Sequence, residues 1–146
     1  SDDDPSREKK EASPNTDSAG GKRVLLAEDN PVNLLVARKM IEELGFDVEA
    51  VKDGKEAVVA FDHGSFRAIL MDWQMPEMDG LEATRQIREK ERDDNRPRTP
   101  VIALTAHALK GDREACLDAG MDDYLTKPLK LADLDRVLKK WLAQGD

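Results

Sequence analysis

The chain has 146 residues with 23 basic and 31 acidic side chains, so its formal net charge is −8. This length allows one compact domain with a tail and hardly two domains. The acidic balance counts against nucleic-acid binding, which needs clustered Lys and Arg. The single cysteine, Cys116, excludes an internal disulfide, and no apolar run approaches the roughly 20 residues of a membrane span. Because the polar N-terminus carries no secretory signal, we expect a cytoplasmic protein without direct membrane contact.

Residues 1–23 are rich in Ser, Asp, Lys, Pro and Gly and contain almost no apolar side chains. Such a segment buries too little surface to offset the entropy that it would lose on ordering. We therefore expect a disordered linker over residues 1–23, followed by a single folded domain over residues 24–146.

A strand pattern and a helix pattern alternate five times after the linker. The apolar runs at 24–27, 68–71 and 101–104 are continuous, which is typical of strands buried on both faces of a parallel sheet. Residues 46–50 alternate and residues 123–126 are short and mixed, so we expect both at the sheet edges. This pattern predicts the doubly wound, flavodoxin-like strand order 2-1-3-4-5. The expected fold is a (βα)5 three-layer α/β sandwich around a parallel five-stranded sheet.

Helix ends are also visible in the sequence. Asn30 and Pro31 form an N-cap and a first-turn proline, and Gly45 is expected to end that helix. An N-cap acid followed three residues later by Glu, a variant of the capping box, occurs twice: at Asp53 with Glu56 and at Asp79 with Glu82.

The last two helices differ in their apolar faces. The final helix has a full apolar stripe, made of Leu131, Leu134, Leu138, Trp141 and Leu142. The fourth has a thinner one, made of Leu109, Ala115, Cys116 and Ala119, with Gly111 inside the helix. We expect the fourth helix to be the least stable and the first to respond to a switch.

Polar side chains stand at the carboxyl ends of four strands. Glu28 and Asp29 follow the first strand, Asp72 the third, Thr105 the fourth and Lys127 the fifth. Ligands of a doubly wound sheet bind at this edge, between the first and third strands, so these side chains should share one crevice. Two unit charges 4 Å apart interact by about 4 kcal/mol at an effective dielectric of 20, so three carboxylates need neutralisation. Lys127 supplies one positive charge, and an all-oxygen site suits Mg²⁺ as the second.

This set of groups fits phosphoryl transfer to an aspartate, in which a metal ion and a lysine take the charge of the transferring oxygens. Four segments of the sequence contain these groups: AEDN at 27–30, LMDWQMPEMDG at 70–80, LTAH at 104–107 and YLTKP at 124–128. Together they resemble the receiver domains of two-component response regulators, from residue 24 to the C-terminus. The stretches EDNPVN, MDWQMPEMDG, TAHAL and MDDYLTKPL are most similar to receivers of hybrid sensor histidine kinases.

The resemblance implies a role for each carboxylate. Asp72 would be the phosphoacceptor. Mg²⁺ would be bound directly by Asp29 and Asp72 and through water by Glu28, with the backbone carbonyl of Gln74 completing the protein ligands.

It also implies a conformational switch. Thr105 would turn its hydroxyl onto one phosphoryl oxygen, and Lys127 would pair with another. Tyr124 would be an aromatic rotor that moves inward when Thr105 is drawn to the phosphate. The Lys127–Pro128 peptide bond would be cis.

Three residues beside the phosphoryl group are expected to tune its hydrolysis rate: Trp73, Gln74 and His107. Trp73 stands where the resemblance implies a smaller residue beside the acceptor. Its ring is therefore expected to narrow access to Asp72 and to report phosphorylation by fluorescence.

The expected partner is a histidine-containing phosphotransfer protein or a histidine kinase domain, docking at Asn30, Pro31, Val32 and Leu35. The chain itself would be monomeric and not an enzyme, but a self-phosphorylating acceptor with slow autodephosphorylation. A hybrid-sensor parent would be a histidine kinase, with this chain as a cytoplasmic portion of a membrane-anchored protein.

Two other functions remain open at this point. One is a phosphatase with an aspartate nucleophile, although such enzymes generally have a second acid where Gln74 stands. The other is a degenerate receiver that serves only as a docking platform, although its acid pair, acceptor, Thr and Lys are all present.

Other reactive residue types in the chain are expected to be structural. His63 and His107 lack a second His at ligand spacing and are expected at the surface. Cys116 is expected to be a small apolar helix residue. Packing roles are expected for Met71, Met75 and Met78, and the charged run at 88–98 is expected to be a solvated helix end.

Overall fold

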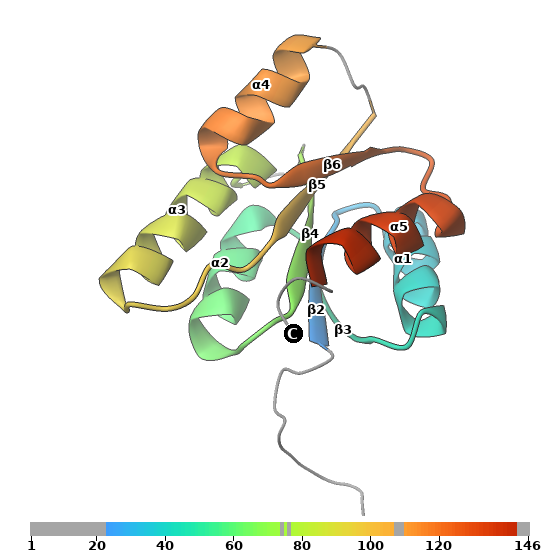
Figure 1. Cartoon of the computed structure of the whole chain (residues 1–146), viewed down its shortest axis with the longest axis horizontal. Helices are drawn as coiled ribbons and strands as arrows, with labels where there is room; N and C mark the ends of the chain where they lie inside the picture. Colours follow the sequence, from blue (N-terminus) through green and yellow to red (C-terminus); the bar gives the residue numbers. More distant parts are fainter. Residues whose placement is uncertain (1–22, 74, 76, 107–109, 143–146) are drawn as a thin grey trace, which may run out of the picture.

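The computed structural model describes residues 23–73, 75, 77–106 and 110–142. Within these ranges strands and helices alternate along the chain (Figure 1). They are β2 (Arg23–Ala27), α1 (Pro31–Glu43), β3 (Asp47–Val51), α2 (Gly54–His63), β4 (Ala68–Asp72), α3 (Gly80–Asp93), β5 (Val101–Thr105), α4 (Lys110–Ala119), β6 (Asp123–Thr126) and α5 (Leu131–Leu142). No helix in the described part of the chain is both long and apolar enough to cross a membrane.

The first strand begins one residue earlier than the sequence predicted. Arg23, expected to be the last linker residue, pairs with Asp47 in the parallel ladder. Its guanidinium forms an ion pair with Glu49 and lies over the ring of Phe66. These partners come from other elements, so the short-range sequence pattern did not indicate them. The remainder of the expected linker, residues 1–22, lies outside the described residues.

The sheet has five strands, all parallel, in the order β3-β2-β4-β5-β6. In chain order this is 2-1-3-4-5, which confirms the predicted doubly wound topology. The order reverses between β2 and β4, because the chain goes from β2 outward to β3 and then returns to the other side. The carboxyl ends of β2 and β4 therefore border the crevice at which such sheets bind ligands.

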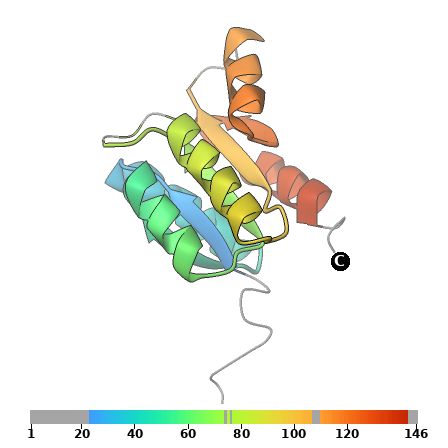
Figure 2. The ribbon, with the colours of Figure 1, turned by 90° about the vertical axis from the view of Figure 1, so that its left-hand side faces the viewer.

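Helices cover both faces of the sheet, as Figure 2 shows. One apolar cluster joins the sheet to α2, α3 and α4, and a second joins it to α1 and α5. Alternate residues of each central strand belong to different clusters: Leu25 packs on the first side and Leu26 on the second. Both are fully buried. The continuous apolar runs in the sequence are thus explained by burial on two faces, at about 1.5–3 kcal/mol for each fully buried leucine.

The expected helix ends are confirmed. The Asn30 side chain accepts hydrogen bonds from the backbone N–H groups of Val32 and Asn33, and Gly45 takes a φ of +98° just after α1. Asp53 and Asp79 each accept a hydrogen bond from the backbone N–H three residues later. These caps fix the start of α1, α2 and α3.

The return hydrogen bond of the two capping boxes is not formed at the N-cap residue. Glu56 accepts instead from the backbone N–H of Lys52, one residue before the cap, at 2.9 Å. Glu82 accepts from the side chains of Arg85 and Gln86, which lie three and four residues along the helix. Each predicted capping box therefore has the hydrogen bond to its N-cap side chain but lacks the return bond to its Glu.

The apolar faces of the last two helices are close to the prediction. In α5, Leu134, Leu138 and Leu142 are buried and Leu131 and Trp141 are half-buried. Of the α4 side chains whose burial is described, Cys116 and Ala119 are buried, and Leu109 lies outside the described residues. The low stability expected for α4 stays a prediction.

The charged run at 88–98 is not simply a solvated helix end, because Arg88 and Glu91 are buried. The Arg88 guanidinium donates hydrogen bonds to the backbone carbonyls of Thr99 and Gly120 and to the carboxylates of Glu91 and Asp122. A guanidinium has five N–H donors in a planar fork, so carbonyls and carboxylates from several elements satisfy it together. This network connects α3 to the start of β5 and to the turn between α4 and β6.

Candidate phosphoacceptor site

A cleft of about 660 Å³ opens at the carboxyl ends of β2, β4 and β5. The five side chains that the sequence predicted at this edge all line it: Glu28, Asp29, Asp72, Thr105 and Lys127. Asn30 and Trp73 also line the cleft, at the start of α1 and directly after β4. The doubly wound topology has thus brought together residues that are up to 99 positions apart, as counted from residue 28 to residue 127.

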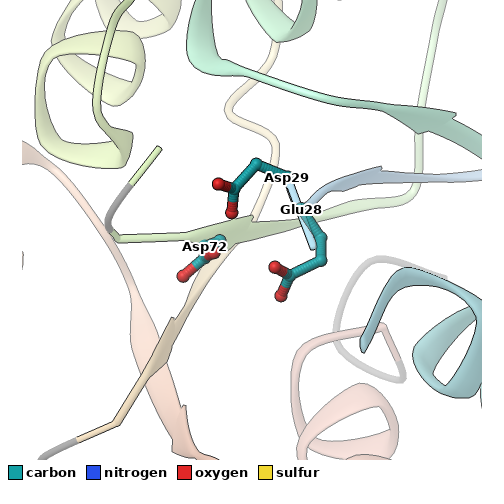
Figure 3. A group of neighbouring side chains, drawn as sticks. All are labelled: Glu28, Asp29 and Asp72. Atoms are coloured by element: carbon teal, nitrogen blue, oxygen red, sulfur yellow. The ribbon is translucent and has the colours of Figure 1, made fainter. Parts of the chain in front are cut away.

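The three carboxylates form one cluster (Figure 3). One oxygen from each of Glu28, Asp29 and Asp72 lies within 4.8 Å of the others. Glu28 and Asp72 are buried, at 1% and 5% exposure, whereas Asp29 is exposed. Neighbouring residues leave a strand end in different directions, and Figure 3 shows Glu28 extending away from Asp29.

Lys127 lies between two of these carboxylates. Its Nζ is 2.9 Å from Oε1 of Glu28 and 3.1 Å from Oδ1 of Asp72. Burial favours the neutral amine, but hydrogen bonding to Glu28 and the negative charges of Asp72 and Glu28 outweigh it, so the pKa of Lys127 is raised. The lysine is therefore a fixed positive charge beside Asp72.

Lys127 alone does not neutralise the cluster. Burial of the Asp72 carboxyl, together with its contact with Glu28, raises its pKa to about 7, although Lys127 acts in the opposite direction. In the protein without a metal ion, Asp72 therefore gains a proton near neutral pH. A divalent cation at this cluster would displace that proton and return the carboxylate to its charged, nucleophilic form.

The ligand atoms fit a small, hard cation. Mg²⁺ takes oxygen ligands at about 2.0–2.1 Å, so two ligands on opposite sides of the ion are about 4 Å apart. One oxygen from each carboxylate of this cluster lies within 4.8 Å of the others, so the three can converge on a single ion. Both Glu28 oxygens already have partners: Oε2 accepts a hydrogen bond from the backbone N–H of Asn30 at 3.1 Å and Oε1 contacts Lys127, while Asp29 faces the open cleft. This difference suits Asp29 and Asp72 as direct ligands and Glu28 as an indirect one; the expected carbonyl ligand, Gln74, lies outside the described residues.

Thr105 and Tyr124 lie on adjacent strands and face the same side of the sheet. The register pairs Ala103 with Tyr124 and Thr105 with Thr126. Ala103 and Tyr124 both pack on the side of α2, α3 and α4, and Thr105 follows Ala103 by two residues and so shares its face. Thr105 is buried, and Tyr124 is half-buried.

The loop after β6 is held against the end of β5. The backbone N–H of Lys127 donates to the carbonyl of Thr105 at 2.8 Å, and the Lys127–Pro128 peptide bond is cis, as expected. This contact places the lysine side chain over the carboxyl ends of β4 and β5.

Trp73 lies at the rim of the cleft with its ring half-buried against the apolar cluster under α2 and α3. Its backbone N–H donates to the carbonyl of Leu104, and its carbonyl accepts from the N–H of Gly80. His107, the other expected tuning residue besides Gln74, lies outside the described residues.

Two glycines also shape the site, a role that the sequence pattern did not indicate. A Cβ atom on Gly80 would lie 2.4 Å from the carbonyl oxygen of Asp72, and one on Gly54 would lie 2.3 Å from that of Met78. Both glycines begin helices, α3 and α2, so the missing side chain lets the loop after Asp72 pack against two helix starts. The spacing of Gly80 from Asp72 was the available signal.

Two of the four expected docking residues, Asn30 and Pro31, line the cleft, and the other two, Val32 and Leu35, follow them on α1. These turns of α1 expose an apolar strip, with Val32 69%, Leu35 52% and Val36 44% exposed. Three other expectations are confirmed: His63 is exposed, Cys116 is buried, and Met71 is part of the core. Met75 and Met78 pack against the same apolar cluster.

Comparison with known proteins agrees with this geometry. The family model described as the response regulator receiver domain matches residues 24–139. The sensor protein GacS of Pseudomonas syringae pv. syringae is 45% identical over 124 residues, which cover 85% of this chain and 14% of that longer protein.

Two solved structures are also similar. The receiver domain of the sensor histidine kinase PA1611 from Pseudomonas aeruginosa, crystallised with a magnesium ion in its active-site cleft, is 50% identical, with a TM-score of 0.76 over 84% of this chain and 98% of that one. A chain from the co-crystal of the Saccharomyces cerevisiae phosphotransfer protein Ypd1 with the receiver domain of Ssk1 is 30% identical, with a TM-score of 0.81 over 87% of this chain and 92% of that one. With this sequence match, this strand order and this acidic cleft, the chain belongs to the response regulator receiver domain family.

Proposed function

We propose that this domain is a phosphorelay module in which Asp72 accepts a phosphoryl group from a phosphohistidine. The observation that carries the proposal is the position of Asp72: it is buried, 3.1 Å from Lys127, and within 4.8 Å of two further carboxylates. Asp29 and Asp72, with Glu28 behind them, would hold Mg²⁺, which would neutralise the charge of the transferring phosphoryl oxygens. Magnesium in the cleft of the PA1611 receiver supports this assignment.

In the proposed reaction an Oδ atom of Asp72 attacks the phosphorus in line with the leaving imidazole. The bond between phosphorus and nitrogen breaks, and its electron pair stays on the imidazole, which is protonated on its other nitrogen or takes a proton from water. The product is an acyl phosphate on Asp72. Lys127 holds one phosphoryl oxygen and the Thr105 hydroxyl donates to another. The domain is thus an acceptor with slow autodephosphorylation and not an enzyme that acts on free substrates.

The same contacts would operate the switch. Movement of Thr105 toward the phosphoryl group empties space on the face that it shares with Tyr124, and the Tyr124 ring turns into that space. The added charge, paired with Lys127 and Thr105, supplies the differential interaction that a population shift requires.

The proposed partner is a histidine-containing phosphotransfer protein or a histidine kinase domain, which docks at Asn30, Pro31, Val32 and Leu35. The exposed apolar strip on α1 borders the cleft, so a partner bound there could present its histidine to Asp72. The complex of Ypd1 with the similar Ssk1 receiver supports this class of partner.

We also propose that the domain is part of a longer parent protein. The match to GacS supports a hybrid sensor histidine kinase as the parent, with residues 24–146 as its receiver and the residues before them as a linker. The domain would be cytoplasmic and monomeric in isolation, and it would not bind nucleic acid, in keeping with the net charge of −8.

Intact mass spectrometry tests the reaction. The native chain, the Asp72→Asn variant and a control variant of an exposed acid, Asp93→Asn, are incubated with Mg²⁺ and acetyl phosphate. One phosphoryl adduct is expected on the native chain and on Asp93→Asn, and none on Asp72→Asn or after chelation of Mg²⁺. An adduct of equal yield on Asp72→Asn would contradict the assignment of the acceptor.

A further inference from the structure

Helix α4 is held unevenly along its length. Among the α4 side chains that the structure describes (residues 111 and 113–119), the buried ones, Cys116 and Ala119, are both in the second half of the helix. The turn that follows is fixed by Arg88, whose Nε donates to the Gly120 carbonyl at 2.9 Å. Toward the start of the helix, the side chains of Arg113 and Glu114 are exposed.

One side chain of the first half of α4 reaches the sheet. The Arg113 guanidinium lies over the ring of Tyr124, 5.4 Å from the ring centroid. A cation within about 6 Å of an aromatic centroid is attracted by the negative face of the ring. Within the described part of the chain, no carboxylate forms an ion pair with Arg113, so the ring is its partner. Figure 1 shows this helix lying beside β6, which carries Tyr124.

We propose that Arg113 is a latch for Tyr124: its guanidinium stabilises the ring in the position seen here and so opposes the inward turn that phosphorylation favours. This inference rests on the proposed switch between Thr105 and Tyr124. When the ring turns into the space behind Thr105, it leaves the guanidinium and the contact is lost. Arg113 is therefore a positioning residue, which acts on the phosphoryl site through Tyr124 without touching it.

Linkage gives the latch a measurable consequence. A contact that stabilises the resting position of the ring weakens binding of a phosphoryl analogue by the same factor, because the two equilibria are coupled. Exposed cation–π contacts contribute about 0.5–1 kcal/mol, which corresponds to about a two- to fivefold change in affinity. Loss of Arg113 is therefore expected to strengthen binding of the analogue by about two- to fivefold.

The test uses beryllium fluoride with Mg²⁺, a phosphoryl analogue that binds the acceptor carboxylate, and measures its affinity by calorimetry. The variants are Arg113→Ala, Arg113→Lys, Tyr124→Leu and the double variant Arg113→Ala/Tyr124→Leu. Arg85→Ala is the matched control, because Arg85 is also an exposed helix arginine but contacts an acid and not a ring. Tyr124 is the single tyrosine of the chain, so ¹³C-labelled tyrosine gives one set of ring signals that reports its position directly.

Arg113→Ala is expected to bind the analogue more tightly and to shift the Tyr124 signals toward their analogue-bound position. Arg113→Lys keeps the cation and should stay within about twofold of the native chain, and Arg85→Ala should leave the affinity unchanged. In the Tyr124→Leu background, removal of Arg113 should have no further effect. Unchanged or weaker binding by Arg113→Ala, or an equal effect of that substitution with and without the ring, would overturn the latch.

The proposed function is checked separately in the same samples. Every variant keeps Asp72, Asp29 and Lys127, so each should form the single phosphoryl adduct with acetyl phosphate. Absence of the adduct from the native chain would count against the acceptor reaction, whereas a normal adduct with no effect of Arg113 would count against the latch alone.

Discussion

Nζ of Lys127 lies 3.1 Å from Oδ1 of Asp72 and 2.9 Å from Oε1 of Glu28. The lysine is therefore shared between Asp72 and a neighbouring acid in the protein without a phosphoryl group. Because the pKa of Lys127 is raised, this positive charge is present at every pH at which the protein would signal. The Lys127 ammonium is therefore already in the site. On transfer of a phosphoryl group to Asp72 it has only to turn from the carboxylates to a phosphoryl oxygen.

The first prediction concerns Lys127→Ala. This change removes the ammonium that would connect the phosphoryl group to β6, but it leaves Asp72 and the acids that would bind Mg²⁺ in place. We expect the Asp72 adduct still to form in the mass-spectrometric assay, with a rate lower by roughly tenfold, the loss of about 1.4 kcal/mol of electrostatic stabilisation. The Tyr124 ring signals should no longer shift on phosphorylation. Lys130→Ala, an exposed lysine three residues later, is the control and should behave as the native chain.

The second prediction concerns pH and stability without a metal ion. The folded-state pKa of Asp72 is raised to about 7, above its value of about 4 in an unfolded chain, so the folded state holds the proton more tightly. The contribution of Asp72 to stability is therefore lost as the pH rises from about 4 through 7. The variant Asp72→Asn does not titrate, so its advantage in unfolding free energy should grow over this window to at most about 4 kcal/mol and then stay constant.

Urea unfolding at several pH values from 4.5 to 8, in the presence of a chelator, measures this difference. Asp93→Asn is the control for a general effect of net charge, because Asp93 is exposed. A stability difference between Asp72→Asn and the native chain that is the same at pH 5 and pH 8 would contradict the raised pKa.

The third prediction concerns metal binding. Below pH 7 the proton on Asp72 must leave before a cation binds, so Mg²⁺ affinity should rise up to about tenfold per pH unit and level off above pH 7. Asp29→Asn should weaken Mg²⁺ by at least about tenfold and leave the unfolding free energy almost unchanged, because Asp29 is exposed. Calorimetric titration with MgCl₂ at pH 6 and pH 8 tests both statements. Equal affinity at the two pH values would contradict displacement of a proton from Asp72 by the cation.

The fourth prediction concerns the glycine at the start of α3. In Gly80→Ala the new methyl group would lie 2.4 Å from the Asp72 carbonyl oxygen, so the backbone at Asp72 must move. We expect a loss of about 1–3 kcal/mol in unfolding free energy and slower adduct formation. Gly111→Ala is the matched control: its Cβ meets nothing within 4 Å, so alanine in α4 should be neutral or stabilising by up to about 1 kcal/mol. Equal effects of the two substitutions would contradict the proposed role of Gly80.

The fifth prediction concerns fluorescence. Trp73 lies at the rim of the cleft beside Asp72, whereas the second tryptophan, Trp141, donates a hydrogen bond from its indole N–H to Asp123 on β6. Emission should therefore change when beryllium fluoride and Mg²⁺ are added to the native chain and to Trp141→Phe. In Trp73→Phe the change should be absent. An unchanged native spectrum, with analogue binding confirmed by calorimetry, would refute the reporter role of Trp73.

The sequence was sufficient for the sheet and for the principal site because both follow short-range patterns. Continuous apolar runs distinguish β2, β4 and β5 from the edge strands, and the residue after each run is then placed at a known edge of the sheet. Glu28 and Asp72 meet for this reason, and Lys127 joins them because it follows the edge strand β6 at the same edge of the sheet. The caps at Asn30 and Asp53 were equally visible, because an N-cap acts on backbone groups two or three residues away.

What the sequence did not predict depends on partners that are distant along the chain. Arg88 and Glu91 look solvated in a charged run, and their burial is possible only because Thr99, Gly120 and Asp122 supply acceptors from other elements. The approach of Gly80 to the Asp72 carbonyl likewise depends on how a loop packs. Ring contacts such as that of Arg113 with Tyr124 have no signature in spacing.

The Arg88 network affects which surfaces of the domain a binding protein could use to distinguish its two states. By binding the carbonyls of Thr99 and Gly120, Arg88 joins the start of β5 to the end of α4, at the edge of the sheet away from the phosphoacceptor. We expect this end of the domain to keep one shape whether or not Asp72 carries a phosphoryl group, and the first turns of α4 to be where the two states differ. A binding protein that contacts the Gly120 turn would recognise the domain in both states, and one that contacts the opposite end of α4 would distinguish them.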